Sequence, residues 1–336
     1  MAADFTDLHD DLRAVAADVL ARGSAVDWAT LVDAGWVGLE VPDGLGGSGA
    51  TFAEVAVICE ELGRAAASTS YLGGAVLAVG VLNTVADSAV RDPLLAGIAD
   101  GTIRAAAVLG DFTVSSGGLL TGHADFVPDA AGADRLLVAA TDAAGGNVVV
   151  VADELTVTAQ PLLDETRSVA TVTADGIEVS ESAVLHANAM AALRNRAALA
   201  VACDSLGLAE AMLAATVDYA KTRTQFGRPI GSFQAVKHAC ADMQVKNSVA
   251  RALIREAVNS SEADLAAAVA MAKSYTCGAA VDVVGKALQL HGGIGYTWES
   301  GIHVYLKRAT FNRSLFGSPA AHRQHLAQRY RTSKAK

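Results

Sequence analysis

The sequence predicts a mainly α-helical chain with a small antiparallel β domain between two helical domains. Residues 1–100 and 187–336 are rich in Ala and Leu with helical spacing. Residues 101–186 instead contain β-branched runs broken by Asp, Gly and Pro. At 336 residues the chain is too long for one small core. We therefore expect three domains with these boundaries.

The first domain begins with a predicted amphipathic helix. Apolar residues recur every three or four positions on its expected face, namely Phe5, Leu8, Leu12, Val15 and Val19. Further along, Thr51 and Glu54 have the spacing of a capping box, which predicts a helix start. Between them, Trp36 and the neighbouring glycines are expected to set helix packing.

The middle domain is predicted from three β-branched runs: Asn147–Val151, Leu155–Thr158 and Ser168–Thr173. After Ala187 the chain returns to long Ala/Leu-rich helices. Asp218 and Ser232 are the candidate helix caps in that region.

Composition excludes several classes of function. A formal net charge of −10 argues against a nucleic-acid or anionic-membrane partner. The longest apolar run, Leu72–Leu82, is too short to span a bilayer, and no signal peptide is evident. The four cysteines lack metal-ligand spacing, so we expect no metal site, and buried thiols suit a reducing cytoplasm.

Two motifs carry the functional information: Tyr219–His238 and, about fifty residues later, Gln289–Tyr296. In this order and at this distance they resemble the C-terminal domain of the acyl-CoA dehydrogenase family. The resemblance covers nearly the whole chain and implies that family's fold, with a C-terminal four-helix bundle. It also implies that these motifs grip the adenine and pyrophosphate end of FAD bound to a neighbouring subunit.

By this resemblance, Arg223 holds the FAD pyrophosphate, because a guanidinium donates several hydrogen bonds to an anion. Phe226 packs on the adenine or ribose, and Gln234 lies beside the adenine end. Gln289, Gly292 and Gly293 match the loop where backbone amides approach the cofactor, since glycine lets the backbone come close. His291 is interpreted as structural.

The chemical half of the family pattern is incomplete. The family's catalytic glutamate removes the α-proton while hydride leaves to the flavin, and its two usual positions correspond here to Phe316 and Ala197. Asp204 lies two helical turns after Ala197 and is the remaining candidate base, with burial expected to raise its pKa. Arg196, beside Ala197, is the candidate substrate-binding residue.

The middle domain also departs from the family. The family's Thr-Glu-Pro loop has no counterpart around Ala105–Asp111. In the strand that covers the flavin ring, Phe126 replaces the usual tryptophan and Pro128 replaces the hydroxyl residue that contacts flavin N5. Proline has no side-chain donor and no backbone N–H, so that contact cannot form.

This asymmetry resembles the smaller subunit of actinobacterial heterotetrameric, steroid side-chain-type acyl-CoA dehydrogenases. It implies FAD, an acyl-CoA substrate, a more complete partner chain and an electron acceptor such as electron-transfer flavoprotein. Two alternatives stay open: a self-sufficient homo-oligomeric dehydrogenase that uses Asp204 as base, and a non-catalytic structural or regulatory subunit. The same fold also hosts oxidases and monooxygenases.

Overall fold

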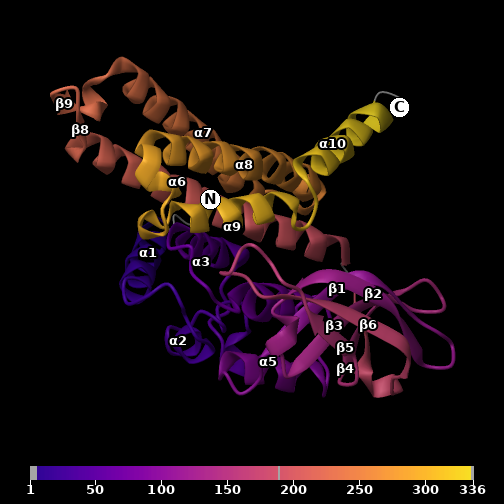
Figure 1. Ribbon diagram of the computed structural model, residues 1–336. Helices are drawn as coiled ribbons and strands as arrows, with labels where there is room; N and C mark the ends of the chain where they lie inside the picture. Colours follow the sequence, from indigo (N-terminus) through magenta and orange to yellow (C-terminus); the bar gives the residue numbers. More distant parts are fainter. Residues whose placement is uncertain (1–5, 188–189, 334–336) are drawn as a thin grey trace. The chain divides into compact units, whose positions relative to one another are not determined.

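Figure 1 shows the computed structural model of the chain, which describes residues 6–187 and 190–333. Helices precede and follow a seven-stranded sheet along the sequence, so the predicted fold class is confirmed. The α-helices are α1 Thr6–Leu20, α2 Trp28–Asp33, α3 Phe52–Arg64, α4 Val79–Leu82, α5 Arg91–Ala99, α6 Met190–Thr222, α7 Gln234–Val258, α8 Glu262–His291, α9 Ile302–Ser314 and α10 Pro319–Ser333. The sheet strands are β1 Ala105–Val114, β2 Leu119–Pro128, β3 Arg135–Thr141, β4 Asn147–Ala152, β5 Thr156–Ala159, β6 Val169–Glu178 and β7 Val184–His186.

The residues form two compact units. The first, here called the bundle unit, contains the described part of residues 1–24, 56–67 and 198–336. The second, the sheet unit, contains residues 25–55 and 68–197. The units therefore differ from the three predicted segments, because helical residues before Gly101 pack with the sheet: a buried π-helix, η2 (Leu72–Ala78), lies against β1.

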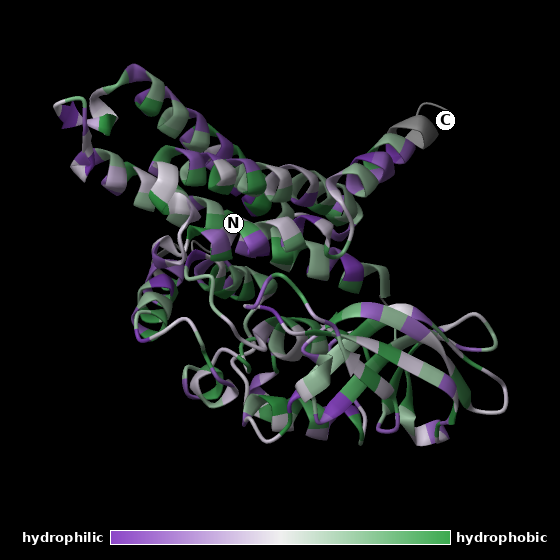
Figure 2. Ribbon diagram, in the orientation of Figure 1, coloured by the Kyte–Doolittle hydropathy of each residue, from purple (hydrophilic) through white to green (hydrophobic). Residues whose placement is uncertain are grey.

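The sheet has the strand order β5-β6-β2-β1-β3-β4-β7. Its neighbouring strands are antiparallel except β1 and β3, which are parallel. The predicted antiparallel arrangement is present in every pair except this one, because the chain leaves the β1–β2 hairpin and crosses to the other edge of β1 before β3 begins. Figure 2 shows the hydropathy of the strands. Strands β1, β3 and β4 contain consecutive buried residues, at Ala105–Val108, Leu136–Ala140 and Val148–Val150, so both faces of the sheet are covered there.

The three β-branched runs form β4, β5 and β6, as predicted. Strands β1 to β3 lacked a strong sequence signal. In β1, Ala105, Ala106 and Ala107 fill buried positions that β-branched residues usually occupy.

Local helix signals had mixed outcomes. Helix α3 begins after a capping box, in which Thr51 N donates to Glu54 Oε2 at 2.8 Å and Ala53 N donates to Thr51 Oγ1 at 3.2 Å. The predicted caps were wrong: Asp218 lies inside α6, and α7 begins after Phe233 rather than at Ser232.

The buried face of α1 also differs from the prediction. Ala16 and Leu20 are buried, whereas Leu8 and Val15 are each 51% exposed. Phe5 lies outside the described residues. Small alanines can pack closely, so their burial is not visible from a pattern of large apolar residues.

In the bundle unit, α6, α7, α8 and α9 share one apolar core. Helix α6 is 33 residues long and apolar enough to cross a membrane by composition, but 83% of its most apolar window is buried inside the protein. This burial is typical of a core helix.

Candidate functional site

The two sequence motifs meet in the bundle unit. Tyr219, near the end of α6, stacks on His291, the last residue of α8, with ring centroids 4.4 Å apart. The Tyr219 hydroxyl donates to the His291 carbonyl at 3.3 Å, and His291 Nδ1 lies 2.8 Å from the Ala287 carbonyl. His291 thus has the structural role that was predicted, and it joins the two motifs.

The predicted cofactor residues all lie on the surface of this unit. Arg223 directly precedes a short hairpin of strands β8 (Thr224–Gln225) and β9 (Arg228–Pro229), visible at the end of α6 in Figure 1, and Phe226 lies in the turn of this hairpin. Phe226 is 92% exposed and has a φ of +54°, an uncommon conformation for a bulky residue. The other exposed members of the set are Arg223, Gln234, Gln289, Gly292 and Gly293.

The glycine turn after α8 is open to an external ligand. Gly292 has a φ of +64°, which favours glycine, and Gly293 does not need a positive φ. A Cβ added at either position would have no described atom within 4 Å. Packing within this fold therefore does not require glycine at position 293. A ligand that approaches the backbone closely would require it.

These residues fit the nucleotide end of FAD. They present a guanidinium, an exposed aromatic ring, two amide side chains and an exposed glycine turn on one unit. The Gln289 Oε1 atom accepts from Lys286 Nζ at 2.7 Å, which adds an ammonium beside the turn. Such a set suits an anionic, aromatic ligand.

Asp204 lies elsewhere in the bundle unit and is 3% exposed. Its carboxylate is paired with Arg308 through Nε at 3.1 Å and through Nη2, and it accepts from Asn312 Nδ2 at 2.5 Å. Arg308 also donates to the Ala67 carbonyl at 2.6 Å. A Cβ on Gly63 would lie 2.0 Å from the Asp204 carbonyl, so the α3 backbone closes this side. The geometry opposes the predicted role of Asp204 as a catalytic base and favours a structural one.

Phe316, at the usual glutamate position, is half-buried in the turn between α9 and α10. It has a φ of +56° and is followed by Gly317 with a φ of +102°. His322 Nε2 lies 3.1 Å from the Phe316 carbonyl. The positive φ values and the contact with His322 constrain the backbone of this turn. The Phe316 side chain cannot accept a proton. Ala197, the other usual position, is buried and equally inert.

Sequence reasoning missed a buried lysine that supports this turn. Lys273 on α8 is fully buried, and its Nζ donates to the Asn312 carbonyl at 2.5 Å. Asn312 is in the last turn of α9, so the ammonium caps the negative end of that helix. A single Lys in an Ala-rich helix gave no signal of this role.

Arg196 belongs to the sheet unit and is engaged within it. Its guanidinium pairs with Glu40, donates from Nε to the Val76 carbonyl at 2.7 Å, and lies 4.8 Å from the Phe52 ring centroid. A Cβ on Gly80 would come within 2.4 Å of Arg196 Nε, so this glycine admits the side chain. These contacts account for Arg196 structurally and oppose its predicted role in substrate binding.

The segment that was expected to cover the flavin ring lies at the end of β2. A register shift between Ala124 and Val127 leaves Phe126 46% exposed with a φ of +54°, while Pro128 is buried opposite Val169. The next residue, Asp129, accepts from Gly73 N at 2.7 Å through Oδ2. This bond ties the segment to the start of η2.

The sheet unit contains a cavity of about 450 Å³ beside the bulged end of β1. Its polar lining includes Asp111, Thr113, Thr141, Asn147 and Arg194. Its size lies within the range of small-molecule sites. The cavity lies beside Leu109–Asp111, in the region where the sequence lacks a counterpart of the family's Thr-Glu-Pro loop.

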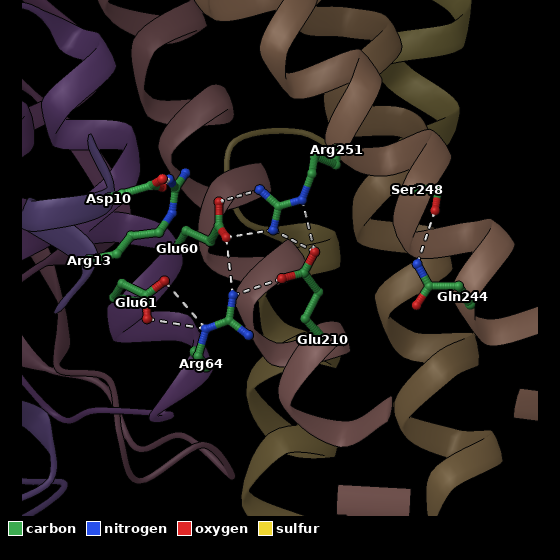
Figure 3. A network of polar contacts seen from close by, with 9 residues as sticks. All are labelled: Asp10, Arg13, Glu60, Glu61, Arg64, Glu210, Gln244, Ser248 and Arg251. Atoms are coloured by element: carbon green, nitrogen blue, oxygen red, sulfur yellow. Dashed lines mark hydrogen bonds and ion pairs between the residues drawn. The ribbon is translucent and has the colours of Figure 1, made fainter. Parts of the chain in front are cut away.

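Figure 3 shows a five-membered ion network in the bundle unit. Arg64 and Arg251 both pair with Glu60 and Glu210, at distances that include 2.7 Å from Arg64 Nη2 to Glu210 and 2.7 Å from Arg251 Nη2 to Glu60. Burial raises the pKa of Glu61, although Arg64, which bonds it at 3.1 Å, acts in the opposite direction. The charges satisfy one another, so this network stabilises the junction of α3, α6 and α7.

No group of three or more His, Cys, Asp or Glu side chains suited to a metal ion is present among the described residues.

Sequence comparisons place the chain among known dehydrogenases. Residues 187–330 match the model for the acyl-CoA dehydrogenase C-terminal domain, and residues 2–102 match that for the N-terminal domain. The chain is 33% identical over 293 residues to acyl-CoA dehydrogenase IpdE2 of Mycolicibacterium smegmatis, covering 87% of this chain and 84% of the relative. It is 31% identical over 316 residues to acyl-CoA dehydrogenase FadE28 of Mycobacterium tuberculosis, covering 88% and 89%.

Solved structures agree in fold. The "Tcur3481-Tcur3483 steroid ACAD" superposes with a TM-score of 0.87 at 27% identity, covering 99% of this chain and 100% of that chain. A chain of the ChsE4-ChsE5 complex from Mycobacterium tuberculosis gives a TM-score of 0.87 at 24% identity, covering 98% and 97%. The agreement extends over almost the full length in each case. The chain therefore belongs to the acyl-CoA dehydrogenase family.

Proposed function

We propose that this chain is one subunit of a hetero-oligomeric, FAD-dependent acyl-CoA dehydrogenase, and that it shares each flavin with a more complete partner chain. Members of the family are FAD-dependent. The proposal rests on the contrast between the residues that would bind a cofactor and the residues at the catalytic positions. The surface that would serve a neighbour's FAD is intact and exposed, whereas Phe316 and Ala197 cannot act as a base and Asp204 is closed in an ion pair.

The names of two solved structures support the partner. One is a steroid dehydrogenase named for two gene products, and the other is a complex of two chains. We extend that arrangement to this chain as part of the proposal, together with an acyl-CoA substrate, an electron-transfer flavoprotein as acceptor and a cytoplasmic location.

In the mechanism, Arg223 would hold the pyrophosphate, Phe226 would pack on the adenosine, and the Gly292–Gly293 backbone would approach the phosphates. Bound FAD would supply the hydride acceptor for α,β-dehydrogenation of the thioester. Phe316 presents a carbon surface where the family has its base, so the proton acceptor would come from the partner chain. The 450 Å³ cavity, with Arg194 at its lining, would suit an anionic part of the CoA ester.

The proposal is tested by flavin content. The chain would be purified alone and after co-expression with candidate acyl-CoA dehydrogenase-like partners, and FAD per chain would be measured by absorbance after denaturation. We expect little FAD alone and a yellow complex with the partner. A homotetramer with one FAD per chain and full activity would overturn the proposal.

A double variant separates a shared site from a purely structural subunit. Replacement of Arg223 and Phe226 by Ala should leave the complex assembled but lower its FAD content, because these side chains make the exposed nucleotide surface. The control replaces two exposed residues outside the motif, Arg313 and Leu163, by Ala. Unchanged FAD in the Arg223/Phe226 variant would favour the structural alternative.

A self-sufficient enzyme with Asp204 as base is the second candidate. Its carboxylate contacts oppose it, but the test is direct: Asp204→Asn would abolish turnover while the fold remains intact. Loss of turnover only in proportion to loss of folded protein would dismiss this candidate.

A further inference from the structure

A lysine on α8 lies three residues before the first residue of the second motif. Lys286 is exposed and forms no ion pair with any carboxylate that the structure describes. Lys246 on α7, by contrast, pairs with Asp282 at 2.7 Å. In a chain with a formal net charge of −10, an exposed ammonium without a carboxylate partner is available to an anion.

Lys286 determines which end of the Gln289 amide faces outward. Its Nζ donates to Gln289 Oε1 at 2.7 Å, and an ammonium group cannot accept, so the amide oxygen is the atom turned toward it. The Nε2 group of Gln289 keeps its two N–H donors, and no residue that the structure describes accepts from them. An amide held in this way suits a ligand oxygen, because the side chain does not have to reorient on binding.

The glycine turn beyond Gln289 lies at the negative end of a helix. Helix α8 runs over 30 residues to His291, so its last carbonyl groups carry a partial negative charge. Gly292 N donates to the Gln289 carbonyl and is already used within the turn. An anion beside this turn is repelled by the helix end unless a nearby cation offsets the repulsion. Lys286 lies on the same helix and supplies such a cation.

Folding stability does not account for the contact between Lys286 and Gln289. Both side chains are exposed, and an exposed pair three residues apart on a helix adds little to the stability of the fold. The contact therefore matters most for a ligand that approaches the turn.

We propose that Lys286 is a positioning residue for the pyrophosphate of FAD. It holds the Gln289 amide so that Nε2 donates to a phosphate oxygen, and its charge offsets the negative end of α8. This inference rests on the proposed function, since it assigns a further residue to the surface that would hold the shared FAD.

Flavin affinity tests this role directly. FAD would be removed from the purified complex and added back in a titration followed by flavin fluorescence. We expect Lys286→Met to weaken FAD binding about fivefold, the usual scale of one lost hydrogen bond. Lys286→Arg should restore most of the affinity, because arginine keeps a positive charge and N–H donors.

The matched control is Lys246→Met, which removes the same charge from α7, where the ammonium pairs with Asp282. This variant should bind FAD as tightly as the natural complex does. A Lys286→Met complex with the same FAD affinity as the control would overturn the proposal.

Two further measurements separate positioning from general damage. In a double-mutant cycle, Lys286→Met and Gln289→Leu together should weaken binding by less than the product of their separate factors, because the lysine acts partly through the glutamine. Raising the salt concentration from about 0.05 to 0.5 M should weaken FAD binding less in Lys286→Met than in Gln289→Leu, because only the lysine variant has lost a charge. Separate factors that multiply, or an equal salt dependence of the two variants, would contradict the positioning role.

The thermal midpoint of the free chain separates binding from folding. It should be the same for Lys286→Met and for the natural chain, since the exposed pair adds little to stability. A midpoint that falls in step with FAD affinity would give Lys286 a structural role and refute the proposal.

Failure of this inference and failure of the proposed function give different results. A homotetramer of this chain with one FAD per chain refutes the proposed function, and the same titration on that homotetramer then decides the role of Lys286. A complex that shares FAD with a partner chain, but binds it equally well after Lys286→Met, refutes this inference alone.

Discussion

At the scale of single residues, the buried charges of the bundle unit do structural work. Asp204 and Arg308 are nearly inaccessible, with side-chain exposures of 4% and 1%. Removing one member leaves the other charge buried without its partner, which costs far more than the pair contributes as a unit. The acid that looked chemically available in the sequence is therefore committed to holding α6 and α9 together.

We predict that Asp204→Ala destabilises the chain by about 3–5 kcal/mol, because Arg308 loses its buried counter-charge. Chemical denaturation measures this change. The matched control is Asp218→Ala on the same helix, where the carboxylate is exposed and pairs with Lys221. A change for Asp204→Ala as small as that of the control would contradict the prediction.

A second residue-level prediction concerns pH. Burial lowers the pKa of His322 below its usual value of 6.5, and the nearby charges of Lys273 and His325 act in the same direction, against the hydrogen bond to Phe316. Below pH 6.5 the unfolded chain binds a proton that the folded chain resists, so this contribution to stability is lost as pH falls. Denaturation curves between about pH 7.5 and 5.5 should show a smaller pH slope for His322→Gln than for the natural chain. An equal slope would contradict it.

At the scale of elements, η2 is the most constrained segment of the sheet unit. All its residues are buried. Asp129 holds its first turn through Gly73 N, and Arg196 binds the Val76 carbonyl further along. π-Helical segments are rare and need such external bonds. The segment was visible in the sequence only as an apolar run.

We predict that Arg196→Met destabilises the chain by about 3 kcal/mol or more, because Glu40 would be left partly buried without a cation. Hydrogen exchange should accelerate in residues 72–80. Arg135→Met, at an exposed position of the same unit, is the control and should change neither quantity. If Arg196→Met changes stability and hydrogen exchange as little as Arg135→Met does, the prediction is wrong and substrate binding by Arg196 stays open.

The comparison of sequence and structure differs between these elements. The fold class and three strands follow from residue type and spacing. Three features depend on tertiary packing: the alanine-rich β1, the parallel β1–β3 pair and the buried face of α1. A pattern of small side chains does not predict such packing. For the candidate site, Tyr219 and His291 were brought together as their motifs implied. Asp204 lies 104 residues from its partner Arg308, and Arg196 lies 156 residues from its partner Glu40, so local reasoning could not find these pairs.

At the scale of the whole molecule, the test is whether surface residues serve another chain. We predict that Gly293→Ala leaves the stability of the chain unchanged, because the added methyl meets only open space in this fold. It should lower the FAD content of the proposed complex, because the methyl would hold the backbone away from the cofactor. Absorbance of the purified complex measures FAD, and a thermal melt of the free chain measures stability.

Gly278→Ala is the matched control, since its added Cβ is equally unopposed and it lies in α8 outside the motif. This control should keep its FAD. An equal loss of FAD in both variants would indicate a general defect of α8 rather than a contact at Gly293.

The exposed Phe226 has a consequence for the amount of protein in a cell. Phe226 is 92% exposed, so it buries little apolar surface within its own chain, and Tyr296 and Trp298 are exposed aromatic residues as well. Quality control removes chains that display such surface before they assemble. If the chain assembles with the proposed partner, its steady-state level should follow the supply of that partner: deleting the gene of the proposed partner should shorten the half-life of this chain even though its own fold is intact.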